Sequence, residues 1–387
     1  MGLRTLELTD PAIEWRNALG FDERDTGRGP RRLPDWTRRQ IPDVIVEAMV
    51  RMTSGVRLAF ATDATRIELD VGLLSFRSVD ESPRTHGIDL VVDGEVQVRE
   101  CTEGGSRFVL DPVTREVLGF EEGSPLTLGF DLDGMPHDVE IWLPTAASAE
   151  IQALRMSADA ILQPPSSSTR RRWVHHGSSI SHCMEVVHPT ETWPAIAART
   201  GGVELTNLAL AGQCHLDQYV ARTMRDLAPD LFSLKVGINI INMDSMKERI
   251  FTPAFHGFVD TIRERNPETP FVIVSPIFCP SAEDHPGPTV PGRDGRFRVI
   301  EGTPALREGS LTLRRVREIL AEAVAQRRAA GDENLHYLDG LTLFAEADHL
   351  AGDLPDDLHP NPAGYARMGE RFVAALFASG APFAAVR

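Results

Sequence analysis

The chain has 387 residues, which is more than one ordinary hydrophobic core uses, so two domains are expected. Its 56 acidic and 40 basic residues give a formal net charge of −16 at pH 7. This charge disfavours nucleic acid or an anionic membrane as a partner, because both would repel the protein. A local basic run at Arg31-Arg32 is expected to be a solvated loop.

The four cysteines are widely spaced and form no C-x-x-C pair: Cys101, Cys183, Cys214 and Cys279. Isolated thiols in a reducing compartment are therefore expected, rather than zinc or redox sites. The first 16 residues carry charges throughout and lack the apolar core of a signal peptide, and no apolar run is long enough to span a bilayer. We expect a cytoplasmic protein that uses no cofactor and no metal.

Residues 44–156 show apolar side chains alternating with a period near two, which is typical of half-buried strands. Strands are predicted at 56–62, 66–71, 87–92, 95–98, 126–130, 139–143 and 150–154. The dipeptide Asp93-Gly94 is a strong hairpin signal between two of them. The pattern predicts an N-terminal antiparallel β-sandwich, jelly-roll-like, over residues 1–165.

A short Pro/Ser linker at 163–169 precedes a change of pattern. Apolar strands are now predicted at 173–176, 203–210, 231–236, 271–277 and 335–338. Helices with an apolar stripe are predicted between or after them, at 216–227, 246–265, 306–330 and 362–378. Five strands alternating with helices predict an α/β fold, here a flavodoxin-like three-layer α/β/α domain over 170–387 with a five-stranded parallel sheet. Ligands of such sheets bind beyond the carboxyl ends of the strands.

A serine follows the first strand of this domain, in His176-Gly177-Ser178-Ser179-Ile180-Ser181. At that edge of the sheet, helix N-terminal N–H groups favour a developing negative charge. Serine becomes a nucleophile only with a base within hydrogen-bond reach. By itself, a serine in such a strand-to-helix turn is more often the N-cap of the next helix. The motif is not G-x-S-x-G, which disfavours an α/β-hydrolase.

A histidine lies just before the last predicted helix, in Asp356-Asp357-Leu358-His359-Pro360-Asn361-Pro362. An acid three residues earlier can accept from the histidine Nδ1–H, which leaves Nε2 free to take a serine proton. Asp356 has this spacing, whereas Asp357 is expected to point elsewhere, into solvent. The alternative is a surface acidic turn before a helix capped by Asn361.

Two further residues follow strand ends and offer hydrogen-bond donors. Gly212 closes the segment after the second strand, and Asn239 lies just after the third. With the backbone N–H of Ser179 they would supply three donors to an oxyanion. Each residue alone is more often a loop glycine or a turn asparagine.

The ordered set resembles the SGNH/GDSL hydrolase superfamily, whose four sequence blocks contribute Ser, Gly, Asn and His in this order. The resemblance implies that Ser179 is the nucleophile and that Gly212 and Asn239 complete the oxyanion hole. It also implies that His359 is the base and Asp356 its acidic partner. By the same resemblance the chain is a serine-dependent acyl-transfer enzyme.

The resemblance covers roughly residues 171–378 and includes Trp193-Pro194, a frequent feature of the family. There are two departures. The usual Gly-Asp-Ser-Leu is replaced by Gly177-Ser178-Ser179-Ile180. Ile240 stands where an aspartate often follows the asparagine, which makes the predicted site less polar.

Further histidines lie near the serine in sequence: His175, His176, His182 and His188. A metal site is not expected, because the adjacent His175 and His176 point to opposite faces of a strand. The residues predicted to line a substrate pocket are His175, His182 and Ile240. The long segment 279–302, rich in Pro, Gly and charge, is expected to be a substrate-covering lid or a disordered loop.

Three functions are compatible with this domain order. The first is an O-acyltransferase of antibiotic biosynthesis that moves a small aromatic (salicylyl-like) acyl group from a thioester onto a hydroxyl of a polyketide such as a tetracycline. The second is a carboxylesterase or carbohydrate acetylesterase that releases the acyl group to water. The third is an inactive SGNH scaffold that acts as a ligand-binding protein. Carbohydrate esterases that resemble this domain order are commonly exported, whereas no export signal is visible here, and this favours the acyltransferase.

Overall fold

The computed structural model describes residues 2–384, apart from 42, 115, 167–168, 293 and 301–306. Contacts divide the chain into two compact units. Unit 1 comprises Met1–Arg170 and Val186–Glu191, and unit 2 comprises Arg171–Glu185 and Thr192–Arg387. The short segment Val186–Glu191 therefore groups with unit 1, although unit 2 precedes and follows it in the chain. None of the helices described is long and apolar enough to cross a membrane.

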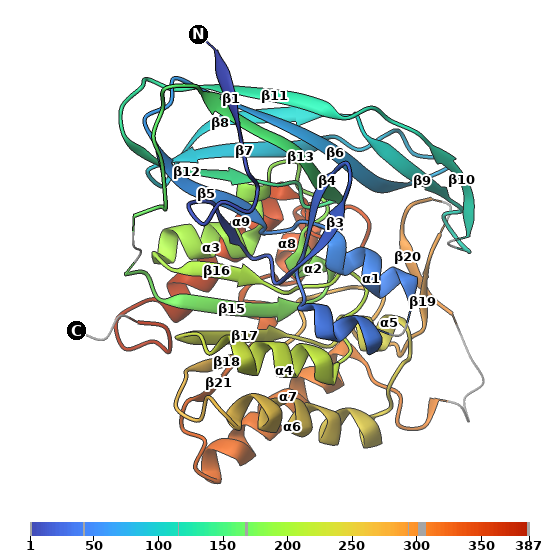
Figure 1. Cartoon of the computed structure of the whole chain (residues 1–387). Helices are drawn as coiled ribbons and strands as arrows, with labels where there is room; N and C mark the ends of the chain where they lie inside the picture. The colour runs from blue at the N-terminus through green and yellow to red at the C-terminus, as the bar shows by residue number, and fades with distance from the viewer. Residues whose placement is uncertain are drawn as a thin grey trace. The chain divides into compact units, whose positions relative to one another are not determined.

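The described part of unit 1 forms two β-sheets that enclose one apolar core (Figure 1). The first sheet has the order β10-β9-β6-β13-β4-β3, with β1 beside β13 and β11 beside β6, and the second has the order β14-β5-β12-β7-β8, with β2 beside β5. Leu69 and Phe130 of the first sheet and Leu90 of the second belong to the same buried cluster. The strands are β1 (Leu3–Leu6), β2 (Glu14–Arg16), β3 (Gly20–Arg24), β4 (Gly27–Arg31), β5 (Arg57–Thr62), β6 (Arg66–Ser78), β7 (His86–Val92), β8 (Glu95–Thr102), β9 (Ser106–Leu110), β10 (Val117–Glu121), β11 (Leu126–Asp131), β12 (His137–Trp142), β13 (Ala147–Ser157) and β14 (Leu162–Gln163).

The alternating pattern of the sequence is realised most clearly in β6. Ile67, Leu69 and Val71 are buried, while the acidic residues between them are only partly buried. Such alternation is what one face of a sheet packed on a core produces. The predicted sandwich is confirmed, with one correction: β9 pairs with β6 in the parallel direction, whereas the other pairs in unit 1 are antiparallel.

The first eight residues of the segment predicted to be extended form a helix, α1 (Val44–Arg51). Its buried residues, Val46, Met49 and Val50, have the spacing of one helix face. Asp43 caps the helix, because its Oδ1 accepts the N–H groups of Ile45 at 2.9 Å and Val46 at 3.0 Å. The prediction was wrong here because three successive apolar residues fit a strand as well as a helix start.

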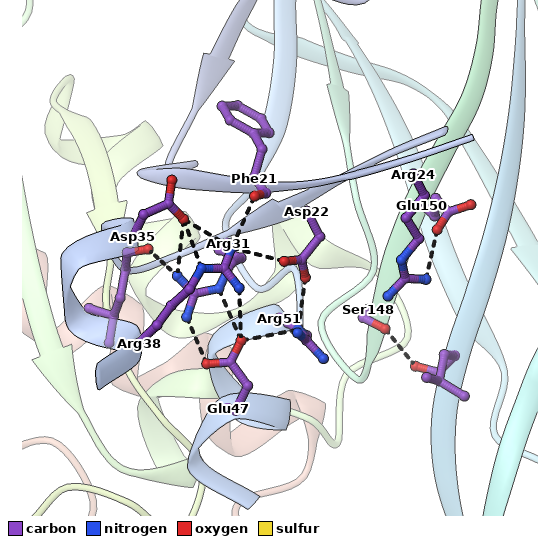
Figure 2. A network of polar contacts seen from close by, with 12 residues as sticks. Phe21, Asp22, Arg24, Arg31, Asp35, Arg38, Glu47, Arg51, Ser148 and Glu150 are labelled. Atoms are coloured by element: carbon purple, nitrogen blue, oxygen red, sulfur yellow. Dashed lines mark hydrogen bonds and ion pairs between the residues drawn. The ribbon is translucent and has the colours of Figure 1, made fainter. Parts of the chain in front are cut away.

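Arg31 and Arg32, predicted to be a solvated loop, are fully buried beside α1. Arg31 forms an ion pair with Glu47 at 2.7 Å, and Arg32 donates to the carbonyl oxygens of Met49 and Met52, both at 2.6 Å. Figure 2 shows Glu47 within a network of arginines and aspartates from β3, β4, the 3-10 helix Asp35–Arg39 and α1. The solvated-loop prediction was wrong because the carbonyls that end α1 and the Glu47 carboxylate require donors.

Unit 2 contains a five-stranded parallel sheet with the order β16-β15-β17-β18-β21. In chain order this is 2-1-3-4-5, the flavodoxin-like arrangement, so the predicted fold class is confirmed. The strands are β15 (Arg172–Gly177), β16 (Glu204–Asn207), β17 (Leu231–Lys235), β18 (Phe271–Val274) and β21 (Leu335–Leu338), and a separate hairpin is formed by β19 (Thr289–Pro291) and β20 (Phe297–Val299).

Helices cover both faces of this sheet (Figure 1). Helices α3 and α9 pack together on one face, and α6 packs against α4 and against α7 on the other. The predicted helix at 306–330 begins at Leu313, since Thr312 caps it by accepting the N–H of Arg315 at 3.2 Å; its predicted first residue, 306, lies outside the described residues. The helices are α2 (Ser179–His182), α3 (Trp193–Gly201), α4 (Gln218–Leu227), α5 (Ile238–Asn242), α6 (Glu248–Arg263), α7 (Leu313–Ala329), α8 (Glu346–Leu350) and α9 (Pro362–Leu376).

Candidate active site

Ser179 is the first residue of α2 and follows the carboxyl end of β15. The helix is capped by the preceding residue, because Ser178 Oγ accepts the N–H of Ile180 at 3.3 Å. The N-cap interpretation of Ser179 is therefore wrong, and its hydroxyl is directed to another partner. Ser179 remains 9% exposed, so the residue lies at the limit of the buried interior.

The partner of Ser179 is His359, in the loop before α9. His359 Nε2 lies 2.9 Å from Ser179 Oγ, and His359 Nδ1 lies 2.7 Å from Asp356 Oδ2. A carboxylate can only accept, so Nδ1 carries the proton and donates it to Asp356. Nε2 is then unprotonated and accepts the Ser179 hydroxyl. A serine, an oriented base and an acid are thus joined by two consecutive hydrogen bonds.

Asp356 is held rigidly by its own loop. Its Oδ1 accepts the backbone N–H groups of Leu358 at 2.9 Å and His359 at 2.6 Å. Burial alone would raise the pKa of the Asp356 carboxyl, but the hydrogen bond from the His359 side chain and those from the backbone N–H groups of His359 and Leu358 outweigh it, so the pKa is lowered. Asp356 is therefore ionised at neutral pH. Asp357 points elsewhere, as expected, but its carboxylate lies 3.5 Å from Arg296 instead of standing free in solvent.

Gly212 lies in the loop after β16, in the left-handed region at φ 72°. Glycine adopts this conformation without the steric penalty of other residues. The loop is fastened to the end of β15, because Leu210 N–H donates to Gly177 O at 2.9 Å. It is also fastened to α2, because Ala211 N–H donates to His182 Nδ1 at 3.3 Å. These bonds fix the backbone N–H of Gly212 near the carboxyl edge of the sheet.

Asn239 lies in the first turn of α5, directly after β17. Its Oδ1 accepts the N–H of Cys214 at 3.0 Å, which leaves the amide Nδ2 as its donor end. This bond also joins Asn239 to the Gly212 loop. The residue before the helix, Gly237, has φ 135°, which only glycine adopts readily. The N–H groups of Ser179, Gly212 and Asn239 thus come from the ends of three adjacent parallel strands.

Residues 176–367 match the model of the GDSL-like Lipase/Acylhydrolase family. This part of the chain is a GDSL-like lipase/acylhydrolase domain. The match spans the serine after β15, the glycine and asparagine loops and the Asp-x-x-His segment, so the predicted resemblance is confirmed. No curated protein sequence matched the chain.

Solved structures resemble the whole chain, both units included. The salicylyl-acyltransferase SsfX3 from a tetracycline biosynthetic pathway has 29% sequence identity and a TM-score of 0.80, with 96% of each chain covered. A putative GDSL-like lipase from Bacteroides ovatus has 17% identity and a TM-score of 0.68, with 97% of each chain covered. A family two carbohydrate esterase from Clostridium thermocellum has 13% identity and a TM-score of 0.59, covering 95% of this chain and 98% of the other. The lipase from Bacteroides ovatus and the esterase from Clostridium thermocellum share their fold with this chain.

The three residues predicted to line a substrate pocket are buried in unit 2. His175, His182 and Ile240 are all 0% exposed. His175 Nδ1 lies 2.7 Å from Ser233 Oγ, and its ring packs edge-on against Trp193. Since none of the three reaches a surface that a substrate could touch, we do not include them among the substrate contacts proposed below. Among the described residues, no group of three or more His, Cys, Asp or Glu could hold a metal ion.

An aromatic residue that was not predicted from the sequence lies against His359. Phe297, at the start of β20, meets the His359 ring edge-on, with ring centroids 5.8 Å apart and planes at 76°. Its backbone N–H donates to Asp356 O at 3.2 Å. Phe297 belongs to the segment 279–302 predicted as a lid, of which 293 and 301–302 lie outside the described residues.

A second carboxylate near the histidine was also missed. Glu185 Oε1 lies 3.8 Å from His359 Nδ1. Its other oxygen accepts the hydroxyl of Tyr365 at 2.7 Å. Tyr365 is fully buried in α9, and burial raises its pKa well above the usual value, so the phenol stays neutral and donates. Nothing in the sequence around Glu185 indicates that it lies near His359, because His359 and Tyr365 come from the far end of the domain.

Proposed function

We propose that Ser179 is the nucleophile of an acyl-transfer enzyme that works through an acyl-enzyme. Ser179 Oγ attacks the carbonyl carbon of an acyl donor while His359 Nε2 takes its proton. The ionised Asp356 stabilises the imidazolium that forms. His359 then returns the proton to the leaving group, and the same steps run in reverse order with an acceptor. The observation that carries this proposal is the hydrogen-bond chain Ser179–His359–Asp356, at 2.9 and 2.7 Å.

The oxyanion of the tetrahedral intermediate would be bound by three donors. They are the backbone N–H groups of Ser179 and Gly212 and the Nδ2 amide of Asn239. Their support is the arrangement of the loops: both Gly212 and Asn239 are fixed by hydrogen bonds that leave the donors at the carboxyl edge of the sheet. Loss of one such donor typically costs about 10²–10³ in rate.

For the acyl group and its acceptor, we propose an O-acyltransferase. It would move a small aromatic, salicylyl-like acyl group from a thioester onto a hydroxyl of a polyketide such as a tetracycline. The support is the likeness to the salicylyl-acyltransferase, 29% identical over 96% of both chains. The aromatic Phe297 beside His359 is compatible with a flat acyl group. A transferase must also hold its acceptor so that water does not take the acyl group.

The alternative within the same chemistry is an esterase, in which water takes the acyl group. It is favoured by the description of the matching family, a lipase and acylhydrolase. The remaining alternative is an inactive scaffold that binds a ligand. The hydrogen-bond chain at Ser179 argues against that reading, since a binding protein has no need of an oriented base.

The first experiment treats the full-length protein with a fluorophosphonate, which phosphonylates serine nucleophiles. We expect labelling of the wild type, loss of labelling in Ser179→Ala, and normal labelling in Ser124→Ala, which removes an exposed serine of unit 1. A wild-type protein without label would overturn the catalytic proposal. In the second experiment a salicylyl thioester is supplied with and without a tetracycline-type acceptor. Free acid as the sole product in every case would overturn the acyltransferase proposal and support the esterase alternative.

A further inference from the structure

Unit 1 contains a second set of residues with the order nucleophile, base, acid. Cys101 lies on β8, Asp89 on β7, and His188 in the segment Val186–Glu191 that groups with this unit. Cys101 Sγ is 3.6 Å from His188 Nε2, and His188 Nδ1 is 2.8 Å from Asp89 Oδ1. Cys101 is exposed, whereas the three other cysteines are buried.

The acid of this set is built into the fold. Asp89 is 0% exposed, and its Oδ2 accepts both the N–H of Thr190 at 3.1 Å and its hydroxyl at 2.6 Å. Its Oδ1 is left for His188. Because a carboxylate only accepts, His188 donates through Nδ1–H, and its Nε2 is the unprotonated nitrogen that faces Cys101. The imidazole is thus held in the tautomer that accepts a thiol proton.

A glycine makes room for the histidine. Gly87 stands opposite Cys101 in the β7–β8 pair, and its N–H donates to Val187 O at 2.9 Å. A Cβ at this position would lie 2.5 Å from Val187 O and 2.9 Å from His188 Nδ1. Any other residue at position 87 would therefore push the segment that carries His188 away from the thiol.

The charges around Cys101 favour its protonated form, so the thiol needs a base to become a nucleophile. Partial burial and the nearby carboxylates of Asp89 and Glu100 raise the pKa of the Cys101 thiol; Glu191 adds to this, and Arg99 opposes it. Arg99 is itself paired with Glu191. At neutral pH the resting group is consequently the thiol, which is a poor nucleophile until a base removes its proton.

We propose that Cys101, His188 and Asp89 form a base-assisted thiol site that undergoes thiol–disulfide exchange with small-molecule disulfides. His188 Nε2 takes the thiol proton, and Cys101 Sγ attacks one sulfur of the disulfide. The disulfide bond breaks, and the departing thiolate takes the proton from His188. Cys101 is oxidised to a mixed disulfide while the small disulfide is reduced to one thiol.

Exchange at sulfur fits this site better than acyl transfer. Because no tetrahedral oxyanion forms, thiol–disulfide exchange needs no oxyanion hole. It requires a nucleophile, a base and access of the disulfide to the sulfur, and the exposed Cys101 thiol and His188 supply these. Because Cys183, Cys214 and Cys279 are buried, they are not available to resolve the product, and the mixed disulfide should persist. The site is independent of the function proposed for Ser179.

The test uses full-length native protein and 4,4′-dithiodipyridine, a neutral disulfide whose thiopyridone product is followed by absorbance. We expect one fast-reacting thiol, lost in Cys101→Ser and unchanged in Ser179→Ala. His188→Gln should slow the reaction at neutral pH by about 10²-fold, the lower end of what a general base typically contributes. His137→Gln is the matched control, because His137 is a histidine of unit 1 that pairs with Asp93 and Asp133.

A second variant tests the same site without touching its three side chains. Gly87→Ala should also slow the reaction, whereas Gly119→Ala, where a Cβ meets nothing within 4 Å, should not. Circular dichroism checks that each variant is folded. Wild-type rates in folded His188→Gln and Gly87→Ala would overturn the proposal. So would a native Cys101 that reacts no faster at neutral pH than the urea-unfolded chain.

Discussion

Glu185 Oε1 lies 3.8 Å from His359 Nδ1, the same nitrogen that Asp356 holds at 2.7 Å. Two carboxylates thus face one imidazole N–H. Asp356 is the direct acceptor, and Glu185 is held at a longer distance by the hydroxyl of Tyr365. If Asp356 is lost, a small movement of Glu185 would bring it within hydrogen-bond reach of His359. Glu185 is therefore a positioning residue, and its contribution should show when Asp356 is removed.

The first prediction is that Glu185 partly replaces Asp356 as the hydrogen-bond acceptor of His359 Nδ1 when Asp356 is removed. We expect Glu185→Gln to lower kcat/KM less than about fivefold, and Asp356→Asn to lower it by about 10²–10³, short of the ~10⁴ seen when a single triad acid is replaced. The double variant should lose more than the product of the two single effects. Ester hydrolysis by the three variants measures this coupling. Purely multiplicative effects would show that Glu185 has only a structural role.

A related variant separates charge from packing. Tyr365→Phe keeps the ring in the core but removes the donor that holds Glu185. Combined with Asp356→Asn, it should change the residual activity and its pH profile, while the melting temperature changes little. Equal residual activity with and without the Tyr365 hydroxyl would show that the tether is irrelevant.

The second prediction concerns the acyl group. The ring of Phe297 meets the His359 imidazole edge-on, so an acyl group on Ser179 would be formed close to it. Phe297→Ala should lower kcat/KM for a benzoyl-type ester by about tenfold, since one aromatic contact contributes about 0.5–1.5 kcal/mol. Acetyl esters should lose only about twofold. Phe120→Ala, which removes an exposed phenylalanine of unit 1, is the control. Equal losses for both esters would contradict this prediction.

The third prediction concerns the glycine before Asn239. In Gly237→Ala the residue keeps φ 135°, and its Cβ would lie 2.6 Å from Pro276 Cγ and 2.8 Å from Val316 Cγ1. We expect a loss of about 1–3 kcal/mol in the free energy of unfolding from backbone strain alone. Activity should also fall because Asn239 shifts. Gly257→Ala, inside α6 with open space around the Cβ, should be neutral or stabilising. Urea unfolding curves of both variants would show whether this contrast exists.

The sequence predicted the residues whose position follows from local order. Ser179, Gly212 and Asn239 each follow a strand, and the carboxyl ends of parallel strands meet at one edge. Glu185 could not be predicted, because its role depends on Tyr365 in α9, far along the chain. Cys101 was interpreted as an isolated thiol for the same reason: its histidine is brought to it by the fold.

Local pattern was misleading where tertiary contacts decide the outcome. The residues of α1 fit an extended segment until the Asp43 cap and the buried face of the helix are known. The parallel pairing of β9 with β6 was not predicted, because periodicity indicates a strand but not its direction. Arg31 was predicted to be solvated because its partner, Glu47, lies on that same unrecognised helix.

The last prediction concerns acid stability. Asp348 in α8 is 7% exposed and forms ion pairs with Arg367 at 2.9 Å and Arg371 at 2.7 Å. Burial alone would raise the pKa of Asp348, but the hydrogen bonds from Arg371, the Ala345 N–H and Arg367 lower it from 3.8 to about 2. A lowered pKa in the folded state stabilises the protein above the unfolded value. This contribution decreases as the pH falls below about 4 and is lost as it passes through about 2.

Asp348→Asn should therefore reduce the free energy of unfolding at neutral pH by about 2–3 kcal/mol, because lowering the pKa from 3.8 to about 2 corresponds to about 1.36 kcal/mol for each pKa unit. The difference from wild type should shrink as the pH is lowered below about 4, because the wild-type carboxylate then becomes protonated as well. Urea unfolding across this range measures it. Asp284→Asn, which removes an exposed carboxylate paired with Arg314, should show a much smaller loss at neutral pH. A difference between Asp348→Asn and wild type that stayed constant down to the lowest pH would mean that packing, not charge, accounts for the loss.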